Sequence, residues 1–330
     1  MMQHTPIHHA EAPAESARTS ATSSDDPGPA IKAIYALSTG SVEQHPEHRY
    51  GTHKPLLWWV LTSRRWIRVP IHCYLLEHRQ GLVLFDTGLD PAIASDANYI
   101  QSPVGRFLLR KLFRLHIGPE DALDRQLSAL GLRTSDVRTA VISHLHFDHI
   151  GGIAHIPQAD LLVSEDEWAQ LSTPRPEKKW VLREHIELPA ARWQPIEFAP
   201  TDDPLLAPFG GTHDVLADGS MVLLPTPGHS PGSLSMLVRS TGRPPVLLVG
   251  DLAYELDSLM NDRVPGIGDA TRLRESFAKV RNLREQLPDL VVLPAHDPSS
   301  VDALAAVFPR RRPPGQLINA LDSAHVEKCG

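Results

Sequence analysis

Short apolar runs alternate with polar loops from residue 31 onward, and runs of this length between turn residues are typical of strands. Only His78, Arg79 and Gln80 separate two of these runs, which predicts a hairpin. The predicted strands cover residues 31–37, 71–77, 81–86, 139–143, 161–163, 221–225, 233–238, 245–249 and 290–293.

Two segments between the predicted strands have helical patterns in the first half of the chain. Residues 119–130 are predicted to form a helix with Pro119 in its first turn and leucines on one face, and Gly131 would end it. Residues 106–115 combine basic and apolar positions, and we expect an amphipathic helix packed on the core with its basic face in solvent. The same segment could instead line a pocket, contact a second copy in a homodimer or face a membrane.

Two further helix starts carry capping signals. Ser164 and Glu167 have the spacing of a capping box. Asp269 can cap a longer helix, because an apolar stripe at helical spacing follows it. That stripe consists of Leu273, Phe277, Val280, Leu283 and Leu287.

The order of the elements predicts an α/β protein in which two sheets pack together and helices cover them outside. We expect one domain over residues 31–310, since 42% of the 330 residues are hydrophobic and supply a sizeable core. Residues 1–30, rich in Ser, Ala, Pro and Asp, are expected to form a disordered tail, and residues 311–330 a C-terminal tail. The Pro-rich region 171–215 has no clear pattern.

Charge and cysteine content narrow the function classes. The net charge of −7 argues against wholesale affinity for nucleic acid or an anionic membrane. The two cysteines, Cys73 in an apolar run and Cys329 near the C-terminus, form neither a disulfide framework nor a thiolate metal site. No apolar run is long enough to span a membrane, and no signal peptide is evident, so we expect a cytoplasmic protein without stable membrane insertion.

Residues 143–149, Ser-His-Leu-His-Phe-Asp-His, hold the strongest chemical signal. His144, His146 and Asp148 alternate along extended chain, so they can share one side, and His149 follows at once. Burying this cluster without a metal would leave costly unpaired polar groups. The cluster therefore predicts a metal site.

Three isolated candidates follow the ends of later strands: His229, Asp251 and His296. Side chains at strand ends gather easily at one site, and the full set suffices for two divalent ions. Imidazole and carboxylate without thiolate favour zinc, with iron, manganese or cobalt as other options. Such a pair activates water, and the implied reaction is hydrolysis at a carbonyl or phosphoryl centre.

Two other residues are candidates for supporting roles. Asp86 could accept the free ring N–H of a ligand histidine, or it could simply cap a turn. Tyr254 follows Asp251 by three residues and could donate to a developing oxyanion, or it could be a packed aromatic. Trp58 and Trp59 could wall a pocket, although core packing is the more common role of tryptophan.

These residues resemble the metallo-β-lactamase superfamily, and most closely its N-acyl-homoserine lactonases. The resemblance covers most of residues 31–310. It is carried by HCYLLE (72–77) with FDTG (85–88), SHLHFDHIGG (143–152), TPGHSPG (226–232), GDLAY (250–254) and the final His296. The 22-residue step from His229 to Asp251 also suits the lactonases.

The resemblance implies a four-layer αββα sandwich and a dinuclear lactonase active in quorum quenching. One metal would sit on His144, His146 and His229, and a second on Asp148, His149 and His296. Asp251 would bridge both, and a bridging hydroxide would attack the carbonyl of a small-molecule lactone. Tyr254 would steady the oxyanion, and Asp148 would relay a proton to the leaving ring oxygen.

Several rival functions share such a site. The 80 residues between His149 and His229 look long for the compact lactonases, with the extra length in 171–215, which leaves the substrate open. Glyoxalase II-like thioesterases and phosphotriester hydrolases remain alternatives. Cysteine-ligated β-lactamases fit less well because no cysteine stands at a ligand position, and the RNA-processing branch because the net charge of −7 does not indicate a nucleic-acid surface. Diiron flavoproteins fit less well because they have Glu at the position of His146 and no flavin module follows here. A non-catalytic metal-binding protein is the last alternative.

Overall fold

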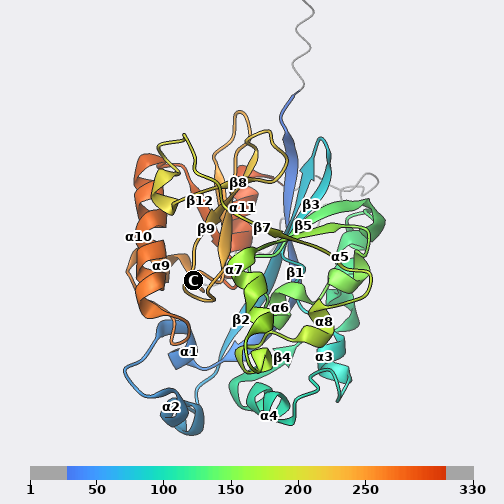
Figure 1. Cartoon of the computed structure of the whole chain (residues 1–330), viewed down its shortest axis with the longest axis vertical. Helices are drawn as coiled ribbons and strands as arrows, with labels where there is room; N and C mark the ends of the chain where they lie inside the picture. Colours follow the sequence, from blue (N-terminus) through green and yellow to red (C-terminus); the bar gives the residue numbers. More distant parts are fainter. Residues whose placement is uncertain (1–27, 310–330) are drawn as a thin grey trace, which may run out of the picture.

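Two mixed β-sheets face each other in the computed structural model, which describes residues 28–309 (Figure 1). The larger sheet has seven strands in the order β4-β1-β2-β3-β5-β6-β7, and the smaller has five in the order β12-β11-β10-β9-β8. The tails predicted at 1–30 and 311–330 lie almost wholly outside the described residues, as does Cys329.

The bounds of the elements are as follows. The larger sheet contains β1 (Ile31–Gln44), β2 (Ile67–His78), β3 (Gly81–Phe85), β4 (Phe113–His116), β5 (Val137–Val141), β6 (Asp160–Ser164) and β7 (Arg192–Ile196). The smaller sheet contains β8 (His213–Asp214), β9 (Met221–Pro225), β10 (Leu234–Val238), β11 (Val246–Gly250) and β12 (Val291–Pro294). The α-helices are α1 (Pro46–Tyr50), α2 (Leu56–Thr62), α3 (Ala92–Ser95), α4 (Pro103–Leu112), α5 (Leu123–Ala129), α6 (Phe147–Ile150), α7 (Glu165–Trp168), α8 (Arg183–Ile186), α9 (Leu256–Met260), α10 (Ala270–Gln286) and α11 (Ser300–Val307).

Strand β11 of the smaller sheet buries the side chains of both its faces. Val246 and Leu248 point into the core between the sheets, whereas Leu247 and Val249 point into the core beneath α10. Full burial of each such side chain contributes about 1.5–3 kcal/mol. A strand that buries both faces therefore reads as a continuous apolar run, as this one does.

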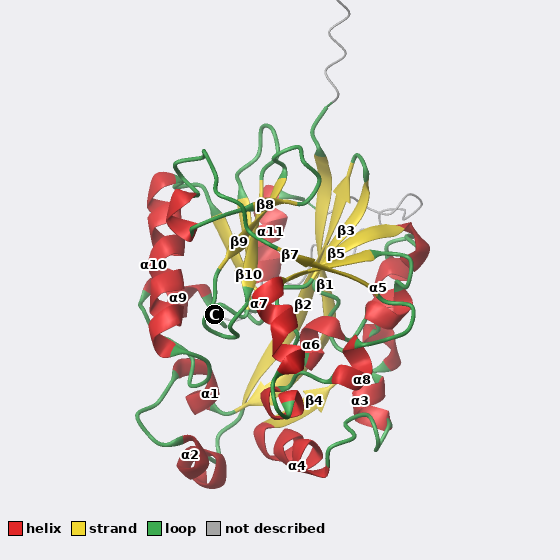
Figure 2. Cartoon of the chain, viewed as in Figure 1, coloured by secondary structure: helices red, strands yellow, loops and turns green. Residues whose placement is uncertain are grey.

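Helices cover the outer face of each sheet, so the predicted four-layer αββα sandwich is confirmed (Figure 2). Helix α10 packs on the smaller sheet through the predicted stripe, and the Asp269 carboxylate caps it by accepting from the N–H groups of Thr271 and Arg272. On the larger sheet the covering helices include α5, through Leu123 and Leu127.

The hairpin and the central strands lie close to their predicted positions. Two elements in the N-terminal half of the chain differ from the prediction. The first strand continues past residue 37 to Gln44, because Gly40 (φ +99°) and a register shift bend it without ending it. The predicted helix 119–130 is broken at Ala122, whose ψ of 144° separates a 3₁₀ turn (Pro119–Asp121) from α5. The prediction of a single helix over residues 119–130 was therefore wrong.

The segment 106–115 also divides into two elements. Helix α4 starts at Pro103, where the Ser102 hydroxyl accepts from the N–H of Gly105, and ends at Leu112. The chain then forms β4, which pairs antiparallel with β1, so the prediction of helix over Phe113–Leu115 was wrong. In the unassigned region 171–215 the structure adds short helices and the two edge strands β7 and β8.

Candidate metal centre

Seven potential ligands from both sheets meet at one edge of the sandwich. The loop after β5 and helix α6 supply four of them, and the loops after β9, β11 and β12 supply one each. Each follows the carboxyl end of a strand, as predicted from the sequence. The side chains brought together are His144, His146, Asp148, His149, His229, Asp251 and His296.

These side chains divide into three overlapping groups whose ligand atoms lie within 4.8 Å of one another. The first group is His144, His146 and His229; the second is His144, His149 and Asp251; the third is Asp148, His149 and His296. The first and third correspond to the two metal positions that the family resemblance implies.

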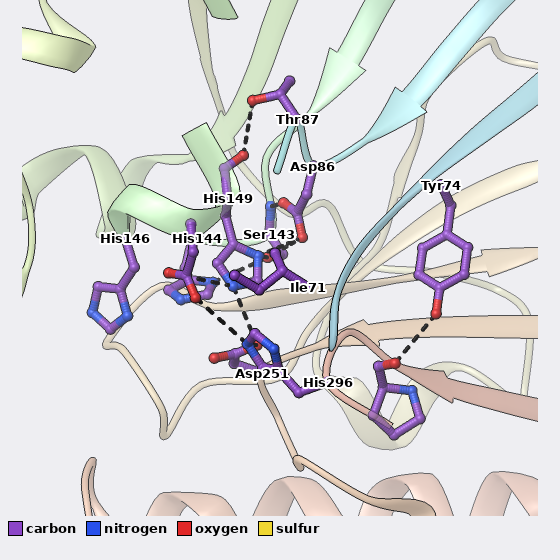
Figure 3. A network of polar contacts seen from close by, with 12 residues as sticks. Ile71, Tyr74, Asp86, Thr87, Ser143, His144, His146, His149, Asp251 and His296 are labelled. Atoms are coloured by element: carbon purple, nitrogen blue, oxygen red, sulfur yellow. Dashed lines mark hydrogen bonds and ion pairs between the residues drawn. The ribbon is translucent and has the colours of Figure 1, made fainter. Parts of the chain in front are cut away.

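Asp251 occupies the middle of the cluster (Figure 3). Its Oδ1 lies 3.2 Å from Nε2 of His149 and 3.1 Å from Nε2 of His296, while its Oδ2 lies 3.4 Å from Nε2 of His229. One carboxylate therefore faces histidines from both outer groups. This is the arrangement required of a residue that bridges two ions.

The chemistry of these donors fits divalent metal ions. Nε2 of His144 is buried and has no hydrogen-bond partner within the described structure. Such a group costs about 1–3 kcal/mol when it is unpaired, so a cluster of them requires compensation. Imidazole and carboxylate ligands suit zinc and related ions.

Burial sets the protonation of three of the histidines. Removal from water lowers the pKa of His146 and of His229 to about 3, and it lowers the pKa of His144 well below 6.5. They are therefore neutral imidazoles, the form that binds metal. Burial also opposes the charged form of His149 and His296, but Asp251 and Asp148 together, with Asp86 at His149, outweigh it and raise the pKa of each.

Asp86 and Ser143 hold two of the histidines in place. The Asp86 carboxylate accepts from Nδ1 of His149 at 2.8 Å, and it also accepts from the N–H and the hydroxyl of Ser143. Nδ1 of His144 lies 3.0 Å from the same hydroxyl. Asp86 therefore has the position proposed for it, and its left-handed backbone (φ 61°) turns the chain sharply at the end of β3.

Glu167 links the loops that carry the ligands. Its carboxylate accepts from the N–H of Leu145 at 3.0 Å, from the hydroxyl of Ser230 and from the N–H of Gly232 at 3.1 Å. The capping-box pattern suggested a different contact, with the N–H of Ser164. Only the Ser164 half of the box forms, since its hydroxyl accepts from the N–H of Glu167.

Tyr254 lies over the cluster and touches a residue that sequence reasoning missed. Its ring centroid is 5.4 Å from that of His296 and 6.1 Å from that of His229, and its hydroxyl lies 3.0 Å from Nε2 of His48. Burial raises the pKa of Tyr254 well above 10, so its hydroxyl keeps its proton. Short-range patterns gave no signal for His48, because 206 residues separate the pair.

A cavity of about 750 Å³ adjoins the metal centre. Its lining residues His48, His146, Trp180 and His229 also line the smaller pocket at the centre itself. Trp59 lines this cavity, whereas Trp58 is exposed, so only one of the two tryptophans contributes to its wall. The apolar lining is completed by Val60, Leu108, Leu112, Val181, Pro231 and Ile267.

The family model described as the metallo-beta-lactamase superfamily matches residues 66–296 of this chain. The chain belongs to the metallo-beta-lactamase superfamily. The match spans strands β2 to β12 and all seven potential ligands, up to His296.

Individual relatives in this superfamily agree with the geometry. The chain is 30% identical over 239 residues to the N-acyl homoserine lactonase AttM of Agrobacterium fabrum, covering 70% of this chain and 83% of AttM. It is 33% identical over 243 residues to a protein of Mycobacterium tuberculosis that bears the name probable metallo-hydrolase, covering 69% of this chain and 74% of that protein. These relatives support a metal-dependent hydrolase.

A solved structure shares the fold. It is an N-acyl homoserine lactone hydrolase with the product N-hexanoyl-L-homoserine at its catalytic metal center, and it aligns with a TM-score of 0.67 at 22% identity. The alignment covers 85% of this chain and 98% of that one. No helix among residues 28–309 is both long and apolar enough to cross a membrane.

Proposed function

We propose that this metal-dependent hydrolase opens the ring of N-acyl homoserine lactones and thereby silences signals of that class. The observation that carries the proposal is the convergence of seven metal donors beneath the protonated hydroxyl of Tyr254, beside an apolar cavity. The names of the lactonase relatives support the same substrate class.

Two ions would be held by the donors described above. His144, His146 and His229 would hold one ion, while Asp148, His149 and His296 would hold the other. Asp251 would be shared between them. Zinc suits this donor set, with iron, manganese and cobalt as alternatives. Bound ions of this kind supply Lewis acidity, which activates water at neutral pH and polarises a carbonyl group.

The protein's own groups then stabilise charge and move the proton. The Tyr254 hydroxyl would donate to the oxygen on which negative charge develops. Asp148 is more exposed than the other carboxylate of the centre, with 15% of its side chain accessible against 5% for Asp251. It would therefore carry a proton to the ring oxygen as the ester bond breaks.

The adjoining cavity would receive the acyl chain. Its walls are predominantly apolar and include Trp59, Leu108 and Leu112, which suits an aliphatic tail better than a charged one. A lactone bound in this way would place its polar ring near the metal donors and its tail between α2 and α4.

The proposal is tested by following acid release from metal-loaded enzyme with lactones of varied acyl length. Thioester, phosphotriester and β-lactam substrates are the comparison set, since each represents another hydrolase class that this centre could serve. We expect acyl-homoserine lactones to give the highest kcat/KM and chelation to abolish turnover. Turnover of a thioester or phosphotriester without any lactone turnover would overturn the proposed substrate.

A further inference from the structure

Helices α2 and α4 lie at the same end of the molecule (Figure 1). Both carry large apolar side chains outside the core. Trp58 and Leu61 on α2 are 61% and 66% exposed, and Val104 and Phe107 on α4 are 53% and 58% exposed. Grouped apolar side chains of this size usually mark a contact surface. We call these four residues, with the basic residues named below, the α2–α4 surface.

His45 links the segment that follows α2 to the end of α4. Its Nδ1 lies 2.9 Å from the carbonyl oxygen of Arg65, and its Nε2 lies 3.3 Å from that of Lys111. Both helices also line the large cavity, through Trp59 of α2 and Leu108 of α4. The exposed apolar side chains therefore belong to two helices that border the same cavity.

The charge of this end is opposite to that of the chain as a whole. Residues 48–76 contain five Lys or Arg and residues 97–119 contain four, and neither stretch contains an Asp or Glu, although the net charge is −7. Arg68 is exposed and donates to the hydroxyl of Ser41. Five other cations of these stretches are exposed and form no ion pair with any carboxylate of residues 28–309. They are Lys54, Arg64, Arg65, Arg110 and Lys111.

Two carboxylates of β1 and α1 have partners of their own. Glu43 contacts Arg114 and His116, and Glu47 accepts from the hydroxyl of Ser63. The ammonium group of Lys111 lies 5.9 Å from the ring centre of Phe107, so a cation and an apolar anchor share one helix face. A lysine in this position can lay its methylene stem along the apolar anchor and keep its charged end in water or at a headgroup.

We propose that the α2–α4 surface docks on an anionic lipid membrane. The exposed apolar side chains enter the headgroup region, and the five cations pair with lipid phosphates. A second copy of the chain is the less suitable occupant, because symmetric pairing would bring the same unpaired cations face to face. Docking requires no spanning helix, in agreement with the lengths of the helices in the described part of the chain.

Docking in this orientation turns the cavity mouth toward the lipid. An amphiphilic ester dissolved in the bilayer could then enter between α2 and α4 without crossing bulk water. This consequence rests on the proposed function, whereas the docking itself does not, and a binding measurement separates the two.

The test is co-sedimentation of the full chain with vesicles of phosphatidylcholine alone or mixed with phosphatidylglycerol. We expect binding to the anionic vesicles only, and at least tenfold weaker binding at about 1 M salt, where the Debye length is about 3 Å. The double variant Trp58→Ser with Phe107→Ser and the double variant Arg64→Glu with Arg65→Glu should each weaken binding at least tenfold. Arg125→Glu with Arg133→Glu, an equal charge change at other exposed positions, is the matched control and should retain binding.

Thermal melts of each variant establish that it is folded, and none of the substituted side chains lines the cavity. Equal binding to both kinds of vesicle, no binding at all, or binding that the α2–α4 variants leave unchanged would each overturn the proposal. A dimer in sedimentation velocity that Trp58→Ser with Phe107→Ser converts to monomer, without vesicle binding by the parent, would assign the surface to a second copy instead.

Discussion

The hydroxyl of Tyr254 lies 3.0 Å from Nε2 of His48, in a buried contact that brings α1 against the loop carrying Asp251. Nδ1 of His48 is buried and has no hydrogen-bond partner among residues 28–309. Burying an unpaired ring nitrogen that only accepts costs less free energy than burying an unpaired ring N–H. The unpaired Nδ1 therefore favours the His48 tautomer with its hydrogen on Nε2. In that tautomer His48 donates to the phenol oxygen and leaves the phenol hydrogen free to point toward substrate.

Replacing His48 by Phe should lower kcat for lactone hydrolysis by about tenfold or more, because a catalytic donor that is slightly misplaced loses much of its effect. His48→Gln keeps an amide N–H near the position of Nε2 and should lose less. Metal content per chain, measured by mass spectrometry, should be unchanged in both. Equal losses in the two variants would show that the ring contributes only by packing.

Removing the hydroxyl itself provides a separate measurement. Tyr254→Phe should lower kcat by about 10²-fold, the usual effect of losing one oxyanion donor, while metal content and the apparent KM change little. Parallel loss of bound metal and of activity would instead indicate a structural tyrosine.

Asp86→Asn tests the support of His149. The amide cannot accept from all three donors that now meet the carboxylate, and it presents an N–H where acceptors are needed. We expect metal affinity to fall about 10–100-fold, as is usual for a partner of a ligand histidine. Competition with a chromogenic chelator measures this, and Asp160→Asn, at an exposed carboxylate, serves as the control.

Glu167→Gln tests the link between the ligand loops. One of the two acceptor atoms becomes an amide nitrogen that faces N–H or O–H donors, so we expect a loss of about 2 kcal/mol in the free energy of unfolding. Metal affinity should fall as well, since the loops of Leu145 and Ser230 carry His144, His146 and His229. An unchanged denaturation midpoint would contradict this role.

Histidine titration predicts how the metal-free protein responds to acid. The pKa values of His48, His146 and His229 are lowered to about 3, chiefly by burial, from 6.5. Between these values the unfolded chain binds more protons than the folded one, so stability rises with pH in this window and is lost on acidification. His149 and His296, whose pKa values are raised, contribute stability below 6.5 that is lost as pH rises through their folded pKa values.

Together these shifts place the maximum stability of the metal-free protein near pH 6.5. Urea denaturation in the presence of a chelator, repeated across pH, measures how the free energy of unfolding falls on the acid side of this maximum (the acid limb) and on its alkaline side. His48→Gln should reduce the acid limb by up to one proton, about 1.4 kcal/mol per pH unit. An acid limb of the same slope in that variant would contradict the assignment to buried neutral histidine.

The sequence predicted the parts of the site that local chain geometry determines. The 144–149 cluster is recognisable because its spacing and the strand before it are local, and His229, Asp251 and His296 each follow a strong strand signal. Residues that act through long-range contacts were missed or misjudged. His48 has no local pattern, and Glu167 was interpreted as a capping residue because its partners Leu145 and Gly232 are distant in sequence.

The elements that the sequence predicted poorly are those whose form depends on neighbours. Strand β4 exists because β1 offers it an edge, which the sequence of 113–116 does not reveal. The edge strands β7 and β8 are short or polar, so tertiary pairing rather than local preference determines them. Ala122 is a good helix former, yet the turn before it places its backbone in the extended region.

The ligands divide between the two sheets, with four from the segment after β5 and three from the loops of β9, β11 and β12. Neither sheet alone can supply a complete coordination sphere. We therefore expect the nascent chain to acquire its ions only after the halves have associated, as the last event of maturation. An organism could for the same reason accumulate a folded but idle enzyme whenever the required divalent metal is scarce, and activate it without new synthesis when supply returns.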